Sequence, residues 1–188
     1  LVVGDWDRDG FGDVVTRQGT HGNLVLWRGN GHGRLTRAAV LGTGFDTVGK
    51  LTAVGDLTGD GYPDLVGQPR GGVLTVYPGK GLAGFGKPYP VYDSRVQGTP
   101  IGVGRWDADG SPDLLLRRGT SVRLMRGNGP GWMAAPAKLG GDLTDLSAYD
   151  WTIGISDLQL TGHPDLVVRQ QGTGRLYAVP GTGAGLNK

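Results

Sequence analysis

The stretch DWDRDGFGD, residues 5–13, decides the fold, because the chain repeats it three more times with small changes. The further copies are DLTGDGYPD at residues 56–64, RWDADGSPD at residues 105–113 and DLQLTGHPD at residues 157–165. Their spacing of about 50 residues is typical of arrays in which one supersecondary unit recurs and stacks on its neighbours. We therefore expect a single repeat domain over residues 1–188, with approximate repeats at 1–50, 51–100, 101–152 and 153–188, the last incomplete.

Each repeat contains short apolar runs separated by Gly and Pro. In the second repeat we expect strands at residues 51–55, 64–67, 73–77 and 87–92, and a turn at residues 68–72. The 38 Gly and 11 Pro residues argue against helices. The pattern predicts an all-β protein made of β-propeller blades, each a four-stranded antiparallel sheet. Because the fourth repeat lacks its last strand, we expect a sector of a larger propeller; a compact four-bladed ring is the alternative.

The acidic residues are concentrated in the repeated loops. All 17 are Asp, and 12 of them lie in the four copies. If bound cations neutralise these carboxylates, the 19 Lys and Arg residues dominate the surface, which favours an anionic partner such as a cell-wall polymer. The Arg residues are scattered, so we expect no nucleic-acid binding. The chain has no Cys, and no apolar run is long enough for membrane insertion.

Carboxylates at alternate positions, followed by a glycine and a further Asp, form a calcium-ligand pattern. Such a loop can wrap side chains at positions 1, 3, 5 and 9 and the carbonyl of position 7 round one ion. An EF-hand needs Glu at position 12 before a helix, whereas Thr16, Gly67 or Leu116 stands there before a strand. Magnesium demands a tighter octahedron, and zinc lacks its usual Cys and His ligands.

The four copies keep this ligand set to different degrees. The first two support a calcium site each. The third has Arg105 at position 1, which removes one carboxylate and offers a competing partner to the others. The fourth retains only Asp157 and Asp165, which we expect to cap turn amides without metal. The candidate ligands are Asp5, Asp7, Asp9, Phe11 and Asp13; Asp56, Thr58, Asp60, Tyr62 and Asp64; and, in the third copy, Asp107, Asp109, Ser111 and Asp113.

A glycine-rich segment follows the third strand of every repeat. The segments are WRGNGHG (27–33), YPGKG (77–81), MRGNGPG (125–131) and VPGTGAG (179–185). Paired with the Asp loops, they resemble the FG-GAP/VCBS repeats of integrin α-subunit propellers and of secreted bacterial proteins. The resemblance implies calcium-binding β-propeller blades and a secreted, extracellular protein. The repeats look most similar to the C-terminal repeat regions of secreted actinobacterial hydrolases such as peptidoglycan amidases.

The sequence contains no recognisable catalytic pattern. It lacks G-x-S-x-G, H-E-x-x-H and nucleotide-binding glycine motifs, so we expect a non-catalytic module that binds cell-wall or other glycans. The alternatives are a protein-interaction scaffold and a part of a secreted hydrolase whose catalytic residues lie outside this chain. Aromatic and polar side chains near the strand ends suit sugar rings, although large side chains there also pack between blades. The candidate ligand contacts are Trp27, Arg28, Tyr77 and Trp132.

Overall fold

The computed structural model describes residues 2–129 and 131–187. The chain divides into two compact units, residues 1–95 and 96–188. In the described residues the helical segments are two short 3-10 helices, η1 (Phe45–Thr47) and η2 (Gly81–Ala83), and none is long and apolar enough to cross a membrane. The all-β prediction is therefore confirmed. Whether the two units form one body, a sector or a closed ring stays a prediction.

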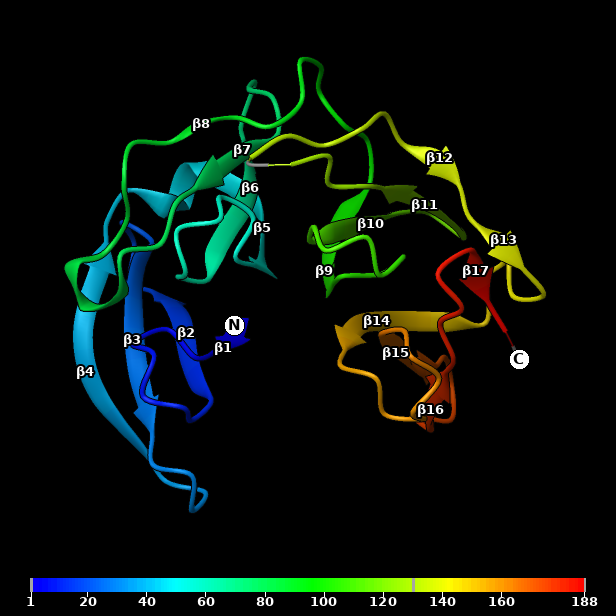
Figure 1. Ribbon diagram of the computed structural model, residues 1–188, viewed down its shortest axis with the longest axis horizontal. Helices are drawn as coiled ribbons and strands as arrows, with labels where there is room; N and C mark the ends of the chain where they lie inside the picture. The colour runs from blue at the N-terminus through cyan, green and yellow to red at the C-terminus, as the bar shows by residue number, and fades with distance from the viewer. Residues whose placement is uncertain (1, 130, 188) are drawn as a thin grey trace. The chain divides into compact units, whose positions relative to one another are not determined.

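The first unit consists of two four-stranded antiparallel sheets, the blades of the first two repeats (Figure 1). Strands are paired in chain order in both blades, so each strand contacts its neighbours in the sequence. Blade 1 contains β1 (Val2–Gly4), β2 (Asp13–Gln18), β3 (Asn23–Gly29) and β4 (Leu35–Gly42). Blade 2 contains β5 (Val48–Gly55), β6 (Asp64–Pro69), β7 (Thr75–Tyr77) and β8 (Tyr89–Pro90).

The second unit holds the other two blades. Blade 3 contains β9 (Thr99–Gly104), β10 (Asp113–Arg118), β11 (Ser121–Met125) and β12 (Ala137–Lys138). Blade 4 contains β14 (Tyr149–Ile155), β15 (Asp165–Gln170) and β16 (Leu176–Val179). Its sheet has three strands, as expected from the missing last strand. Two further short strands, β13 (Gly140–Gly141) before blade 4 and β17 (Gly185–Leu186) after it, form a parallel pair.

The core of each unit lies between its two blades. In the first unit, Val15 and Leu26 of blade 1 pack in one buried cluster with Leu65 of blade 2. Trp6 lies edge-on to Phe85, with ring centroids 6.2 Å apart. In the second unit, residues of blade 3 such as Leu115 and Leu124 share a cluster with Leu166 and Val168 of blade 4. Each blade therefore buries one face against its neighbour, which explains why a single repeat would not be stable alone.

An arginine at the same repeat position ties the two blades of each unit together. Arg17, four residues after Asp13, donates to the backbone carbonyls of Phe45 and Val48 at the start of blade 2. Arg117, four residues after Asp113, donates to the Tyr149 carbonyl and, at 2.8 Å, to the Thr152 hydroxyl of blade 4. These charge-assisted hydrogen bonds link β2 to the start of blade 2 and β10 to blade 4.

The fourth position of every Asp loop has a left-handed backbone. Its φ is 65° at Arg8, 76° at Gly59, 62° at Ala108 and 56° at Leu160. This conformation costs a residue with a Cβ about 1–2 kcal/mol, whereas glycine adopts it freely. The second repeat thus carries the residue that the loop geometry prefers, and the other three hold some strain.

Replacing Leu160 by Gly should stabilise the protein. Leu160 is 89% exposed, so no packing is lost, and we expect a gain of about 0.5–1 kcal/mol after the entropy cost of glycine. Urea denaturation measures the change. Gly59→Leu is the matched reverse variant, because a Cβ at Gly59 meets nothing within 4 Å; it should lose a similar amount. A lower free energy of unfolding in Leu160→Gly would contradict the claim that the backbone at Leu160 is strained.

Candidate functional site

A buried carboxylate closes every Asp loop. The Asp at the ninth position is 0% exposed in all four copies. One of its oxygens accepts the N–H of a glycine in the glycine-rich segment, and the other accepts an N–H from the start of the loop. The glycine donors lie at 2.8, 2.8, 2.9 and 3.0 Å and are Gly29 to Asp13, Gly79 to Asp64, Gly127 to Asp113 and Gly181 to Asp165. This carboxylate therefore joins the two motifs that the sequence repeats.

Only glycine fits at the donor position. A Cβ at Gly29 would lie 2.0 Å from the Gly12 carbonyl oxygen, and one at Gly79 would lie 2.0 Å from that of Pro63. The corresponding distances are 2.4 Å at Gly127 and 2.0 Å at Gly181. Because backbone stands on the other side, a larger residue cannot be accommodated by moving a side chain. The close approach explains why glycine recurs at this point of each repeat.

Gly29→Ala should therefore destabilise the first unit strongly. The added methyl group forces β3 away from Gly12 and weakens the hydrogen bond to Asp13, which together should cost about 2–4 kcal/mol. Thermal and urea denaturation measure the loss. Gly49→Ala is the control, since its Cβ meets nothing within 4 Å. Equal stabilities of the two variants would contradict the steric argument.

The first loop gathers three carboxylates that can hold one metal ion. Oxygens of Asp5, Asp7 and Asp13 all lie within 4.8 Å of one another. Ligands on opposite sides of a calcium ion are about 4.6–5.2 Å apart, so this grouping fits a shared ion. Desolvation, reinforced by the nearby Asp13, raises the pKa of Asp7. Its buried Oδ2 is in contact with the Arg28 Nε. A bound cation would offset the desolvation of Asp7 in the same way.

The other predicted ligands of this loop have different partners. Asp9 accepts the Phe11 N–H at 2.9 Å, and its second oxygen lies 3.1 Å from Nη2 of Arg28. The Arg28 Nε contacts Asp7 Oδ2. Asp9 is thus held by an arginine instead of lying in the three-carboxylate group. The part that we expect the Phe11 carbonyl to play stays a prediction.

The second loop has fewer carboxylates together. Asp56 accepts the N–H groups of Asp60 and Gly61 at 3.0 and 2.8 Å, and Asp60 pairs with Lys80 at 2.5 Å. The Thr58 hydroxyl is buried near Asp60 and Asp64 without a well-formed hydrogen bond, which leaves it suitable as a neutral ligand. Ligation of an ion by this loop, with the Tyr62 carbonyl among the ligands, stays a prediction.

In the third loop, the cationic partner is Arg126. Its Nε lies 2.7 Å from Asp107, whereas Arg105 makes no ion pair within residues 2–129 and 131–187. Asp109 accepts the Ser111 N–H at 2.8 Å. Burial, aided by the negative charge of Asp107, raises the pKa of Asp113 to about 6. Ligation of an ion by these three aspartates and the Ser111 carbonyl stays a prediction.

The raised pKa of Asp113 predicts an unusual pH dependence of the metal-free protein. The folded state binds this proton more tightly than the unfolded chain, whose Asp pKa is near 3.8. The free energy of unfolding should therefore fall by about 2 kcal/mol as the pH rises from about 4 to about 6, and stay level above. Urea denaturation in EDTA checks the slope, and carboxyl NMR should place the Asp113 midpoint near 6. Stability that rises through this window would contradict the prediction.

The fourth loop uses its carboxylates to hold its own backbone. Asp157 accepts the N–H groups of Thr161 and Gly162 at 2.8 and 2.7 Å. Desolvation opposes ionisation, but these hydrogen bonds outweigh it and lower the pKa of Asp157. Asp165 accepts those of Leu158 and Gln159, both at 2.9 Å. The prediction that these two residues cap turn amides is confirmed.

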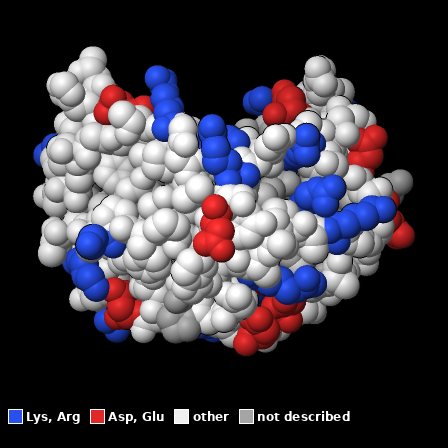
Figure 2. Space-filling model, turned by 90° about the horizontal axis from the view of Figure 1, so that it is seen from above, with Lys and Arg blue, Asp and Glu red and all other residues white. Residues whose placement is uncertain are grey.

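Basic side chains at the first three loops were not recognised as partners in the sequence. Arg28, Lys80 and Arg126 all come from the glycine-rich segments. Each of them is adjacent to the glycine that donates to the buried Asp of its repeat, and this recurrence in the sequence could have indicated a partner for the loop carboxylates. On the face shown in Figure 2, basic side chains lie beside acidic ones in several places. The ion pairs of Arg28, Lys80 and Arg126 with the loops explain why some of the basic residues are distributed among the repeats.

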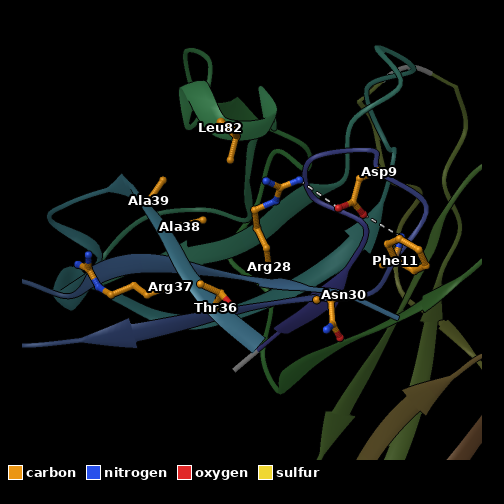
Figure 3. A pocket seen from close by; sticks show the side chains of 10 residues that line it. Asp9, Phe11, Arg28, Asn30, Thr36, Arg37, Ala38, Ala39 and Leu82 are labelled. Atoms are coloured by element: carbon orange, nitrogen blue, oxygen red, sulfur yellow. Dashed lines mark hydrogen bonds and ion pairs between the residues drawn. The ribbon is translucent and has the colours of Figure 1, made fainter. Parts of the chain in front are cut away.

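A groove of about 620 Å³ lies next to the first loop (Figure 3). Its walls come from the first loop, the end of β3, strand β4 and helix η2. Arg28, Arg37, Asn30 and Thr36 supply polar groups, and Leu82, 53% exposed, supplies an apolar surface. The remaining lining residues are Asp9, Phe11, Gly29, Ala38 and Ala39. Hydrogen-bond donors beside apolar faces can hold a polar ligand with flat apolar patches, such as a sugar.

Of the four predicted ligand contacts, only Arg28 lines this groove. Trp27 is half-buried, and its Nε1 donates to the Thr16 hydroxyl at 3.0 Å. Tyr77 is 9% exposed and packs 5.0 Å from the Phe45 ring, so it fills space in the core. Trp132 is 47% exposed but belongs to the second unit.

The second unit has a smaller groove of about 340 Å³. Blade 3 contributes Thr99, Ile101, Arg117 and Gly119, and blade 4 contributes Asp150, Trp151 and Thr152. Trp151 is 42% exposed. Asp150 is engaged by Arg169 at 2.9 Å, and Arg117 is occupied with blade 4, which leaves few free polar groups.

Comparison with known proteins supports the repeat assignment in part of the chain. Residues 5–67 match the family model of the FG-GAP-like repeat. This segment covers the first loop, its glycine-rich segment and the second loop. No curated protein matches the chain.

Two solved structures share the fold. A lectin from Agrocybe aegerita, described as specifically recognising non-reducing terminal N-acetylglucosamine, superposes with a TM-score of 0.63 at 20% identity over 99% of this chain. The Photorhabdus luminescens Tc holotoxin pore matches with a TM-score of 0.53 at 20% identity over 98% of this chain. The chain spans 50% of the lectin chain and 9% of the holotoxin chain. At this identity the likeness concerns the β-propeller fold alone.

Proposed function

We propose that this chain is a non-catalytic, calcium-binding β-propeller module of a secreted protein that binds a glycan in the groove beside Arg28. The observation that carries the proposal is the adjacency of that groove to the first Asp loop: Asp9 and Phe11 belong to both. An ion that orders the loop therefore also orders one wall of the groove (Figure 3).

Calcium is supported by the donor chemistry of the loops. The three grouped carboxylates of the first loop and the Thr58 hydroxyl of the second are hard oxygen donors of the kind that calcium prefers. Extracellular modules bind calcium in about the 0.1–1 mM range, which suits loops with few ligands and a secreted location.

A glycan ligand is supported by the lining of the groove and by the lectin that shares the fold. Arg28, Arg37, Asn30 and Thr36 offer donors to hydroxyl groups, and Phe11 and Leu82 offer apolar surface to a sugar ring. The Agrocybe aegerita protein is described as recognising N-acetylglucosamine. We propose that the side chains of this chain's own groove determine which sugar it binds. A cell-wall polymer is the partner that we favour.

A second candidate function is protein interaction through the fourth blade. Leu158 occupies the loop position of Trp6 and Trp106, which are 1% and 0% exposed, yet it is 62% exposed. Leu176 in β16 is also 62% exposed. Apolar side chains that are exposed where other repeats bury theirs offer surface that a protein partner could cover.

A glycan array with and without EDTA, combined with thermal melting, tests the main proposal. At calcium concentrations about 100-fold above the dissociation constant, one site adds about 2.7 kcal/mol, so EDTA should lower the melting temperature by about 5–10 °C. Specific, EDTA-sensitive binding of a saccharide is expected, together with loss of both effects in an Asp5→Asn/Asp7→Asn double variant.

Asp46→Asn serves as the matched control, because Asp46 is an exposed aspartate of the same unit outside the Asp loops. It should behave like the wild type in both measurements. An unchanged melting curve in EDTA would contradict calcium binding. A silent array with a protein captured through blade 4, and lost in Leu158→Asp, would favour the second candidate.

A further inference from the structure

We infer that Arg28 is a built-in competitor of the metal ion in the first Asp loop, and that ion binding frees its guanidinium to receive an anionic group of the ligand in the groove. The inference rests on the proposed function, since it takes both the ion site and the groove as functional. It adds the chemical class of the ligand, a saccharide with a carboxylate or sulfate group, and the residue that makes its binding depend on the ion.

The guanidinium and the ion would share one carboxylate. Arg28 Nε contacts Oδ2 of Asp7, whose side chain is 4% exposed and belongs to the three-carboxylate group. The Arg28 Nη2 lies 3.1 Å from Asp9 Oδ2. The positive charge of Arg28 thus stands where a divalent ion would compete for the same oxygens. Because like charges repel at short range, binding of one cation weakens the attraction of these oxygens for the other.

The same arrangement recurs wherever a loop carries extra carboxylates. Lys80 pairs with Asp60 at 2.5 Å, and Arg126 pairs with Asp107 at 2.7 Å. The fourth loop has Gln159 and Thr161 in place of these aspartates, and Pro180 stands where Arg28 and Arg126 stand in their segments. A basic residue of the glycine-rich segment therefore accompanies the additional acid. This matching points to charge compensation in the absence of a bound ion.

Release of Arg28 would change the charge of the groove. Arg28 and Arg37 are its basic lining residues, and Asp9 is its acidic one (Figure 3). While Arg28 pairs with Asp7 and Asp9, its Nε and one Nη2 donor are engaged by carboxylates, although 44% of its side chain is exposed to solvent. Once an ion binds the Asp7 oxygen that Arg28 contacts, the guanidinium is free to bind a carboxylate or sulfate through two parallel hydrogen bonds, a geometry that arginine favours.

Calorimetric titration of calcium into the metal-free chain tests the competition. Arg28→Gln should bind calcium about tenfold more tightly than the wild type, because the competing ion pair is removed. Arg28→Lys keeps the charge and should stay close to the wild type. Arg34→Gln removes an exposed charge from the same unit that makes no ion pair in the described part of the chain, so it should also stay close. Equal or weaker calcium binding by folded Arg28→Gln would overturn the inference.

Titration with glucuronic acid and with glucose, in calcium and in EDTA, tests the release into the groove. Glucuronic acid should bind more tightly than glucose in calcium, and this preference should disappear in EDTA and in calcium-loaded Arg28→Gln. A preference that survives either change would overturn the inference. If a neutral glycan from the array binds with calcium and Arg28→Gln leaves its affinity unchanged, the proposed function stands and the inference fails. If no saccharide binds under any condition, the proposed function fails as well.

Discussion

The buried aspartate at the ninth loop position is the interaction on which each blade depends. It accepts one N–H from the start of the loop and one from a glycine at the end of the third strand, so one carboxylate ties the loop before β2 to the segment after β3. Asp13 does this with Gly29, and Asp165 does it with Gly181 in the loop that has lost most of its other acid. The link is therefore separable from metal binding, because it persists where the ligand set does not.

The same buried carboxylates create an electrostatic problem that the loops solve with cations. Burial raises the pKa of Asp64, and that of Asp113 to about 6, so ionisation there costs free energy unless positive charge is near. Arg28, Lys80 and Arg126 supply such charge from the glycine-rich segments. In our proposal a calcium ion supplies it in their place. Because Arg28 also lines the groove beside the first loop, replacement of Arg28 by calcium at the carboxylates would affect ligand binding in that groove.

The site was less predictable than the fold, for reasons visible in single residues. Trp27 and Tyr77 share a repeat position, and an aromatic side chain suits either a sugar or a core. Tyr77 is in the core, because η1 brings Phe45 against it. Arg28 was a candidate sugar contact but not an ion-pair partner of Asp7, since contacts between residues so far apart in the chain depend on how β3 lies beside the loop.

Short apolar runs, glycine spacing and the recurrence of the Asp motif were enough for the sequence to specify four blades, an all-β fold and a three-stranded last sheet. Within each repeat these features act locally, since turns and short strands are determined by residues close together in the chain. The tertiary structure alone decided which carboxylates gather, which basic residue meets each loop, and where a groove opens. Those outcomes depend on distances between segments that only packing sets, such as η2 of blade 2 against β4 of blade 1.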